Sequence, residues 1–275
     1  MARHTRRAVL GGLAAVGLAG CTGRLGGDGE RTAETSERTL STVPETLSVT
    51  NEVGAVSVTG EDRSDVGIEL TRRGPPGRIE KLAFGVQRDG SSVSLVGETT
   101  NEGLIQNDAG LSLEITVRVP TSVAVERVET TVGDVRLTGV GGDPTVESTV
   151  SEVTVRSVNG FVSAQTTAGD VTIRDVGGLD RVEATTGDLA LDVPSLRSDS
   201  SITTTTGDVD LAVAPELDAA VSVSAETGSV TVSELPLTVT EQTTGAEVNG
   251  TLGGGDDRLS VETTVGTVTL RRLPA

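Results

Sequence analysis

The ten residues VETTVGDVRL (128–137) open a series of eight similar segments that runs almost to residue 275. The later segments begin 17 to 21 residues apart and read VESTVSEVTV (146), AQTTAGDVTI (164), VEATTGDLAL (182), ITTTTGDVDL (202), VSAETGSVTV (223), TEQTTGAEVN (240) and VETTVGTVTL (261). A repeat of this length is typical of solenoids, in which one short unit cannot bury its apolar face and stacked units share a core.

Each segment alternates as a β-strand does. Positions one, three and five are small or β-branched, positions eight and ten are Val, Leu or Ile in most units, and the residues between are polar. This alternation, with a period of two residues, predicts two half-buried strands. The glycine at position six and the acid at position seven predict a tight turn between them. We therefore expect an all-β, β-helix-like parallel solenoid of about eight coils over residues 128–275. At about 4.8 Å per strand, eight coils span about 40 Å.

Residues 46–127 differ from the repeats and are expected to form an irregular β cap. They open with a divergent unit, Val49–Gly60, and continue with candidate strands at 66–71, 84–88, 92–96 and 112–119, with one helical turn near 78–83. In the seventh unit, Glu247 and Asn249 stand where core residues belong, whereas Val248 and Leu252 fit only after a slip of one residue. A β-bulge would restore the apolar face there, and the break is a candidate binding notch.

The first 45 residues indicate export and lipid attachment. Arg6 and Arg7 precede a short apolar stretch, as in a twin-arginine signal (1–20), and Leu18-Ala19-Gly20-Cys21 is similar to a lipobox. Cys21 is the single cysteine of the chain, so it has no disulfide partner; the alternative is a lone thiol in an uncleaved leader. Residues 21–45 are predicted to be the lipidated cysteine and a disordered linker. The expected location is the outer face of the cytoplasmic membrane or the cell surface.

The chain is strongly acidic, with 40 Asp and Glu against 22 Lys and Arg. Removal of residues 1–20 takes away three arginines and moves the formal charge from −18 to −21. Lys81 is the only lysine, a bias that resembles proteins of extreme halophiles. If the repeats stack in register, Glu129 and Glu147 lie one coil apart. Their carboxylates then repel each other by about 0.8 kcal/mol in water, and concentrated salt screens this repulsion.

A family resemblance rests on three features in order: the opening Asn51–Gly60, a strand that ends in Val119-Pro120, and the iterated T-x-G-D-V coils. Together they resemble the adhesin domain family of bacterial and archaeal surface proteins, catalogued as a domain of unknown function, over about Leu47 to Leu273. The export signal resembles that of haloarchaeal lipoproteins. The resemblance implies a parallel β-solenoid at the cell surface with an adhesive role, and it supplies no catalytic residues.

The composition excludes most catalytic chemistry. His4 is the only histidine and lies in the signal, so the mature domain has no histidine base and no free thiol. Zinc sites of His and Cys are excluded for the same reason, and no cofactor motif is present. Nucleic-acid binding is not expected of a chain this acidic, in which aromatic residues make up 1%. We therefore predict no enzyme activity and no cofactor.

Two outward rows remain as candidate sites. The flattest row is a candidate contact ladder made of Thr131, Thr149, Thr167, Thr185 and Thr205. A row of acids at position seven is a candidate calcium site only in the less favoured interpretation, because acids at this position also shape turns and face solvent, and the row lacks the denser Gly-Gly-x-Gly-x-Asp spacing of calcium-binding β-rolls: Asp134, Glu152, Asp170, Asp188 and Asp208. Asn249-Gly250-Thr251 is a glycosylation sequon.

The partners predicted from this pattern are the membrane, through lipidated Cys21, and an unidentified envelope protein or glycan. A structural, scaffolding or adhesive role is favoured. The alternative is a glycan-binding or glycan-cleaving solenoid, in which Arg136, Arg156 and Arg174 approach one another across coils.

Overall fold

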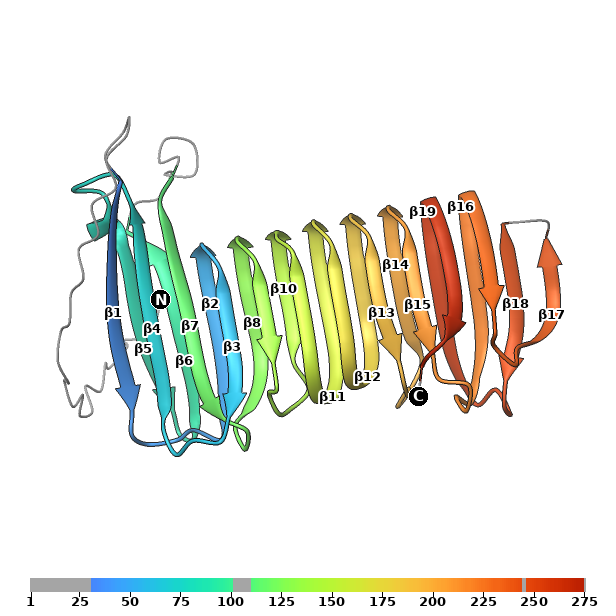
Figure 1. Cartoon of the computed structure of the whole chain (residues 1–275), viewed down its shortest axis with the longest axis horizontal. Coiled ribbons are helices and arrows are strands. Elements are labelled where there is room, and N and C mark those ends of the chain that lie inside the picture. The colour runs from blue at the N-terminus through green and yellow to red at the C-terminus, as the bar shows by residue number, and fades with distance from the viewer. Residues whose placement is uncertain (1–30, 101–109, 244–245, 275) are drawn as a thin grey trace, which may run out of the picture.

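The computed structural model of the protein describes residues 31–100, 110–243 and 246–274, and these form an elongated all-β rod (Figure 1). The strands that precede the repeats are β1 (Thr32–Leu40), β2 (Thr46–Val53), β3 (Val56–Glu61), β4 (Val66–Gly74), β5 (Leu82–Asp89), β6 (Ser92–Thr99) and β7 (Ser112–Pro120), with one short 3-10 helix, η1 (Ile79–Lys81). All four candidate strands and the helical turn predicted within 46–127 are therefore present.

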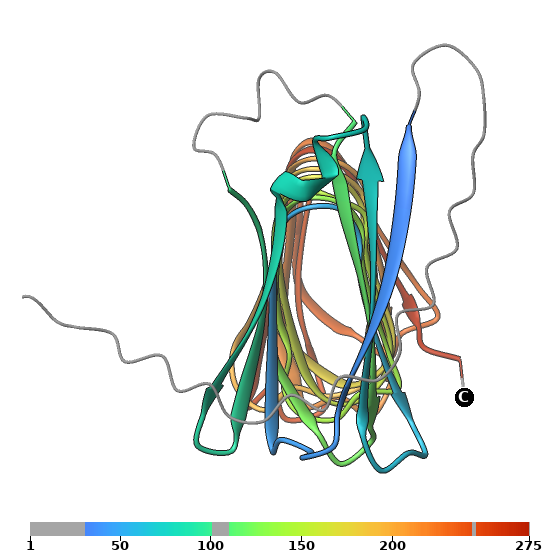
Figure 2. The ribbon, with the colours of Figure 1, turned by 90° about the vertical axis from the view of Figure 1, so that its left-hand side faces the viewer.

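The repeats form the remaining strands. They are β8 (Ala124–Val132), β9 (Val135–Thr138), β10 (Thr145–Val150), β11 (Val153–Ala168), β12 (Val171–Thr186), β13 (Leu189–Val193), β14 (Ser200–Thr206), β15 (Val209–Val213), β16 (Ala219–Ser233), β17 (Thr238–Thr243), β18 (Glu247–Leu252) and β19 (Asp257–Arg272). Repeat positions one to five lie on one side of the rod, here called the first wall, and positions eight to eleven on the other, the second wall. Seen along the rod, the coils superpose as two facing walls joined by turns (Figure 2).

Parallel pairing places each repeat position on the same position of the next coil. On the first wall Val128 pairs with Val146, and Val146 with Ala164. On the second wall Val135 pairs with Val153, and Val153 with Val171. The parallel solenoid predicted from the repeat is thus present in this register, and one outward residue type forms a row along the rod.

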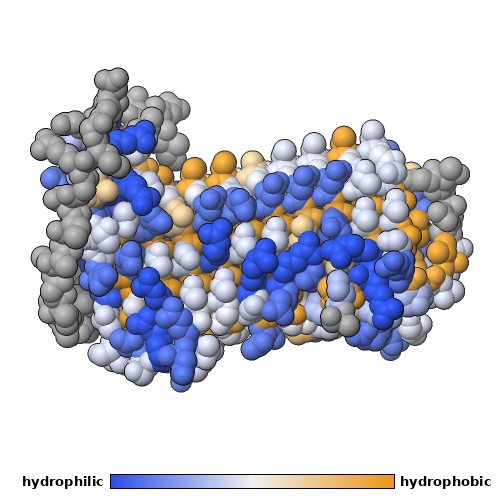
Figure 3. Space-filling model, viewed as in Figure 1, coloured by the Kyte–Doolittle hydropathy of each residue, from blue (hydrophilic) through white to orange (hydrophobic). Residues whose placement is uncertain are grey.

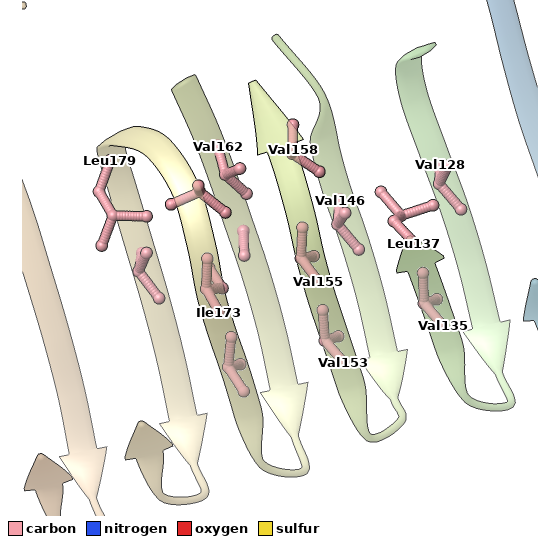
Figure 4. Packing of buried hydrophobic residues seen from close by; sticks show 14 of the residues in the cluster. Val128, Val135, Leu137, Val146, Val153, Val155, Val158, Val162, Ile173 and Leu179 are labelled. Atoms are coloured by element: carbon pink, nitrogen blue, oxygen red, sulfur yellow. The ribbon is translucent and has the colours of Figure 1, made fainter. Parts of the chain in front are cut away.

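Stacked inward residues at positions one, eight and ten form the main rows of the core, and others such as Val158, Val162 and Leu179 pack with them (Figure 4). Val128, Val135 and Leu137 are at most 1% exposed, as are their equivalents in the next coil. Burial of such a side chain stabilises the fold by about 1.5–3 kcal/mol. Position five was expected on the same face, and this expectation was wrong: Val132 and Val150, the last residues of β8 and β10 before the turn, are 41% and 50% exposed. Hydrophobic side chains accordingly protrude along the upper edge of the rod in Figure 3.

The turn glycine is required for two physical reasons. Gly187 and Gly207 have φ of +150° and +153°, a region that residues with a Cβ rarely adopt. A Cβ on Gly207 would also lie 2.0 Å from the carbonyl oxygen of Gly187 in the adjacent coil. The glycines therefore stack on one another's backbones, which the need for a tight turn alone does not predict.

The N-terminal cap contains two further parallel layers and three antiparallel strands. β2 and β3, the divergent unit, stack on β8 and β9, and β6 and β7 stack on β2 and β3. Beyond them β5 pairs antiparallel with β6, and β4 with β7. β1 pairs with β4 along nine residues, so the prediction that all of 21–45 is a disordered linker was wrong. The alternation of polar and small residues in β1 suits an edge strand.

The seventh unit is not a coil. The slip of one residue is confirmed, because Val248 and Leu252 are buried and Glu247 and Asn249 are not. The slipped strand β18, however, runs antiparallel to β16 and forms a hairpin with β17 at the far end of the rod. The break in the repeat is thus the C-terminal cap, and it satisfies the open edge of β16 on the first wall.

The coils do not stack in sequence order. β19 carries the last repeat unit, but it pairs with β14 and β15 on one side and with β16 on the other. The final unit therefore lies between the fifth and the sixth (Figure 1).

Candidate functional site

The row of acids at position seven lies along the turn edge and bonds to backbone amides. The Asp188 carboxylate accepts the N–H of Asp208 at 2.8 Å, and the Asp208 carboxylate accepts the N–H of Thr267 at 2.7 Å. The same bond joins Asp170 to the N–H of Asp188 at 2.9 Å and Asp134 to that of Glu152 at 3.2 Å. These four aspartates therefore connect their turns to the turn of the next coil.

This use of the carboxylates bears on the calcium alternative. Within residues 31–100, 110–243 and 246–274, no group of three or more His, Cys, Asp or Glu side chains is placed to hold a metal ion. The row from Asp134 to Asp208 is spaced one acid per coil, and the backbone amides take one oxygen of most members. The chemistry visible at the row is hydrogen bonding between coils.

The buried threonine at position three has a related role. Thr204 donates its hydroxyl to the carbonyl of Gly187 at 3.3 Å, and Thr263 donates to that of Gly207 at 3.2 Å. Both side chains are at most 2% exposed. A hydroxyl that satisfies a turn carbonyl explains why a polar residue is tolerated in the core.

The candidate contact ladder faces outward on the first wall. Thr149, Thr167, Thr185 and Thr205 are exposed and Thr131 is half-buried. Their flanking residues pair in register from coil to coil, so the five form one row. A shallow polar hollow of about 230 Å³ crosses the N-terminal part of this row. Its outward lining residues are Glu129, Thr131, Glu147, Thr149, Gln165 and Thr167.

The outer face of the first wall is acidic beside this row. Glu129 and Glu147 occupy paired positions, as predicted. The Arg127 guanidinium lies 2.7 Å from the Glu147 carboxylate, which offsets part of the repulsion between the two acids. The hollow therefore combines threonine hydroxyls with carboxylates.

The arginines of the glycan alternative lie on the second wall. Arg156 and Arg174 pair directly, whereas Arg136 pairs with Thr154 and so lies elsewhere in the register. Arg174 donates to the Asp192 carboxylate at 2.6 Å. A hydrophilic band covers this part of the second wall over β12, β13, β15 and β19 (Figure 3).

A hollow of about 410 Å³ lies within this band. Its charged lining residues are Arg174, Asp175, Asp192 and Arg271, and Leu273 and Pro274 form one side. Arg271 donates to the Asp210 carboxylate at 3.0 Å. Both arginines of the hollow are therefore already paired with carboxylates.

Sequence reasoning missed a cluster on the loop edge of the rod. Arg197 donates to Asp143 at 2.5 Å, pairs with Asp180 and lies 4.7 Å from the centre of the Phe161 ring. Asp143 also accepts the Phe161 N–H at 2.8 Å. Asp143 and Arg197 come from loops, and Phe161 and Asp180 lie within β11 and β12. The ion pair between Arg197 and Asp143 spans 54 residues of sequence. Loop residues vary in the repeat, so no periodic signal marks them.

The charges of this cluster reinforce one another. The N–H of Phe161, followed by Arg197, lowers the pKa of Asp143 from its ordinary value of 3.8. Hydrogen bonds from Arg197 to Asp180 and then to Asp143 raise the pKa of the guanidinium. Both shifts favour the ion pair over the neutral forms. The cluster clamps the loops of adjacent coils together.

The export and lipidation residues Arg6, Arg7 and Cys21 lie outside the described residues. In the described part of the chain no helix has the length and apolar character needed to cross a bilayer. At the sequon, the Asn249 amide donates to Glu247 at 2.8 Å and is half-buried in β18.

A model of the family described as Toastrack DUF4097 matches residues 111–271, a shorter span than the expected Leu47 to Leu273. No curated protein matches the chain.

Several solved structures resemble it at low identity. A protein from Clostridium sporogenes proposed to act in cell adhesion is 9% identical, with 86% of this chain and 99% of that one covered and a TM-score of 0.40. A proposed adhesin from Bacteroides fragilis is 14% identical, with coverage of 86% and 96% and a TM-score of 0.34. A proposed lipid-binding protein from Parabacteroides distasonis is 10% identical, with coverage of 88% and 97% and a TM-score of 0.42.

Proposed function

This chain belongs to the Toastrack DUF4097 family, and from that premise we propose that it is a non-catalytic rod of the cell surface with an adhesive or scaffolding role. In this proposal a lipid on Cys21 holds the rod at the outer face of the cytoplasmic membrane, after export through the signal that contains Arg6 and Arg7. The acidic, lysine-poor composition suits a haloarchaeal type of exported lipoprotein.

One observation carries the proposal: the polar residues of the repeat divide between holding the coils together and forming a flat outward row. The inward threonines Thr204 and Thr263 and the turn aspartates bond to backbone groups, as Thr204 does to Gly187 and Asp188 to Asp208. The outward threonines, of which Thr149 is an exposed example, lie along a flat wall beside Glu129 and Glu147. A periodic, flat surface of hydroxyls and carboxylates suits contact with an extended polar partner, such as an envelope protein or glycan.

Replacement of one threonine on each wall tests the contact ladder. We expect Thr149→Lys on the first wall to weaken binding of the full-length protein to isolated cell envelopes by about tenfold, because a bulky side chain interrupts a flat interface. Thr172→Lys is the matched control, since Thr172 occupies an outward position on the second wall. Equal binding by the two variants would exclude the threonine row as the contact surface.

Glycan binding or cleavage is the second candidate, and the hollow that contains Arg174 and Asp192 favours it. Turnover or binding of acidic and neutral glycans, compared between the native protein and Arg174→Ala, tests this alternative. Binding or turnover that does not depend on Arg174, or none at all, would remove it.

A further inference from the structure

The chain leaves a gap one coil wide in its own rod and fills it with its last strand. After β15 ends at Val213, the connection Ala214–Asp218 carries the chain past the neighbouring position before β16 begins. The vacated position is occupied by β19, which pairs in parallel with β14 and β15 on one side and β16 on the other. Figure 1 shows β19 in red between them.

The fit of β19 in this gap equals that of an interior coil. Its inward residues Leu259, Val261, Val268 and Leu270 are at most 1% exposed. Its pairing with β16 extends from Asp257 to Arg271, across both walls and the turn. The gap is therefore a complete binding surface for an extended strand of about fifteen residues.

The two sides of the gap recognise specific features of β19. Asp208 accepts the N–H of Thr267 at 2.7 Å, and Asp210 accepts the Arg271 guanidinium at 3.0 Å. At the turn, only a glycine fits: a Cβ on Gly266 would lie 2.0 Å from the Gly207 carbonyl oxygen. On the β16 side, a Cβ on Gly228 would lie 1.8 Å from the Gly266 carbonyl oxygen.

The covalent connection into β19 passes through a separate surface loop. Residues Gly253 and Gly254 are exposed, and the loop is held by bonds from Gly255 N–H to Asp218 at 2.6 Å and from Arg258 N–H to Asp199 at 3.1 Å. The pairing of β19 with β16 begins at Asp257, after both glycines. Recognition of β19 is thus separable from its attachment.

We propose that the gap between β14–β15 and β16 is a strand-binding slot, which the β19 segment of a second copy of this chain can fill in place of the resident strand. The backbone ladder, the turn glycine and the acids Asp208 and Asp210 act on the strand whichever copy supplies it. The partner is identified by its chemistry: two runs of alternating β-branched residues on either side of a turn glycine.

A cleavable form of the full chain tests the slot. A protease recognition sequence is inserted between Gly253 and Gly254, the folded protein is cut, and the cut protein is unfolded and refolded with dye-labelled peptide 257–275, the probe for a second copy's strand. The chain has no Trp or Tyr, so the dye is the only strong fluorophore. At about tenfold excess of peptide, we expect about nine tenths of the rods to carry the label, since the two strands compete by mass action.

Two variant peptides separate specific binding from adhesion to exposed edges. The Gly266→Val peptide should be incorporated about tenfold less than the native peptide. Valine disfavours the positive φ of this turn, and its Cβ would clash with the Gly207 carbonyl oxygen. Thr264→Val is the matched control, since Thr264 faces outward beside the same turn, and should be incorporated like the native peptide.

Three outcomes overturn the proposal. The first is a cut protein that regains no structure with any peptide while the uncut chain refolds under the same conditions. The second is equal uptake of the native and Gly266→Val peptides. The third is refolding without uptake of the native label. Uptake of the native and Thr264→Val peptides alone supports the proposal.

Discussion

The carboxylate of Asp188 accepts the backbone N–H of Asp208 at 2.8 Å, one coil further along the rod. The two residues occupy the same repeat position, so Asp208 repeats the bond to the following turn at Thr267. One side chain per coil thereby continues, at the turn edge, the ladder that the backbone forms within the walls. This relationship gives the acid of the repeat a structural purpose.

Asp188→Ala should lower the free energy of unfolding by about 1 kcal/mol, because the Asp208 N–H loses its acceptor at a partly exposed turn. Urea unfolding of the full-length protein measures the change. Glu216→Ala, an exposed acid in the loop before β16, is the control and should change stability little. Equal effects of the two substitutions would contradict the proposed turn-to-turn bond.

Gly207→Ala should destabilise the fold by at least about 2 kcal/mol, since the added Cβ meets the Gly187 carbonyl at 2.0 Å in a backbone conformation of positive φ. Gly85→Ala is the matched control because a Cβ at Gly85 meets nothing within 4 Å. Thermal unfolding of both variants checks the expectation. A Gly207 variant as stable as the Gly85 variant would disprove the close stacking of turn glycines.

Acid should weaken the loop clamp through Asp143. The pKa of this carboxyl is lowered in the fold, by the Phe161 N–H and then by Arg197. Because the pKa is lowered, the charged carboxylate stabilises the fold fully at pH values above the ordinary pKa of 3.8. This stabilisation is lost as the pH falls through the pKa of the folded state. Asp143→Asn should therefore reduce stability near neutral pH and flatten its fall in acid. Parallel curves for both proteins from pH 6 to about pH 2 would show that Asp143 does not contribute.

Low salt should destabilise the rod. The paired Glu129 and Glu147 lie on an acidic wall of a chain with a formal charge of −18. Dilution from about 2 M to about 0.1 M salt lengthens the screening distance and should lower the melting temperature. Glu129→Gln should reduce this dependence more than Glu216→Gln, the loop control. A melting temperature that does not move with salt would contradict the importance of the charge row.

Cys21→Ser should release the protein from membranes if a lipid on Cys21 is its anchor. Fractionation of cells that express the native or the variant protein measures the membrane-bound share. Cys21→Ala removes the thiol equally and should give the same result. Retention of either variant in the membrane fraction would refute lipid anchoring.

Parts of the fold were predictable because they depend on local pattern. Val128, Val135 and Leu137 alternate with polar residues, and they are buried as expected. The slip at Val248 could also be read from the residues, since only one register buries this side chain. Alternate residues of a strand face the core, so the spacing of apolar residues in the sequence indicates which side chains are buried.

Other features could not be read from pattern. Val132 continues the apolar alternation but is exposed at the end of β8, next to the turn. β1 was expected to be disordered, since its residues Thr32–Leu40 lack apolar periodicity and are stabilised mainly by pairing with β4. The candidate ladder of threonines was placed in register, but the Arg197 clamp arises from loops that no repeat position marks.

The sequence by itself determined the coil: the period of about eighteen residues, the glycine turn, and the inward direction of positions one, eight and ten. Only the tertiary structure decided the order of the coils, with β19 between β15 and β16 and an antiparallel hairpin at the end. The physical reason is that successive coils present nearly the same Val, Leu, Thr and Gly ladders, so each is a suitable neighbour for several others. The loop connections and the capping hairpin select one coil order among arrangements whose strand pairing is nearly equal in stability.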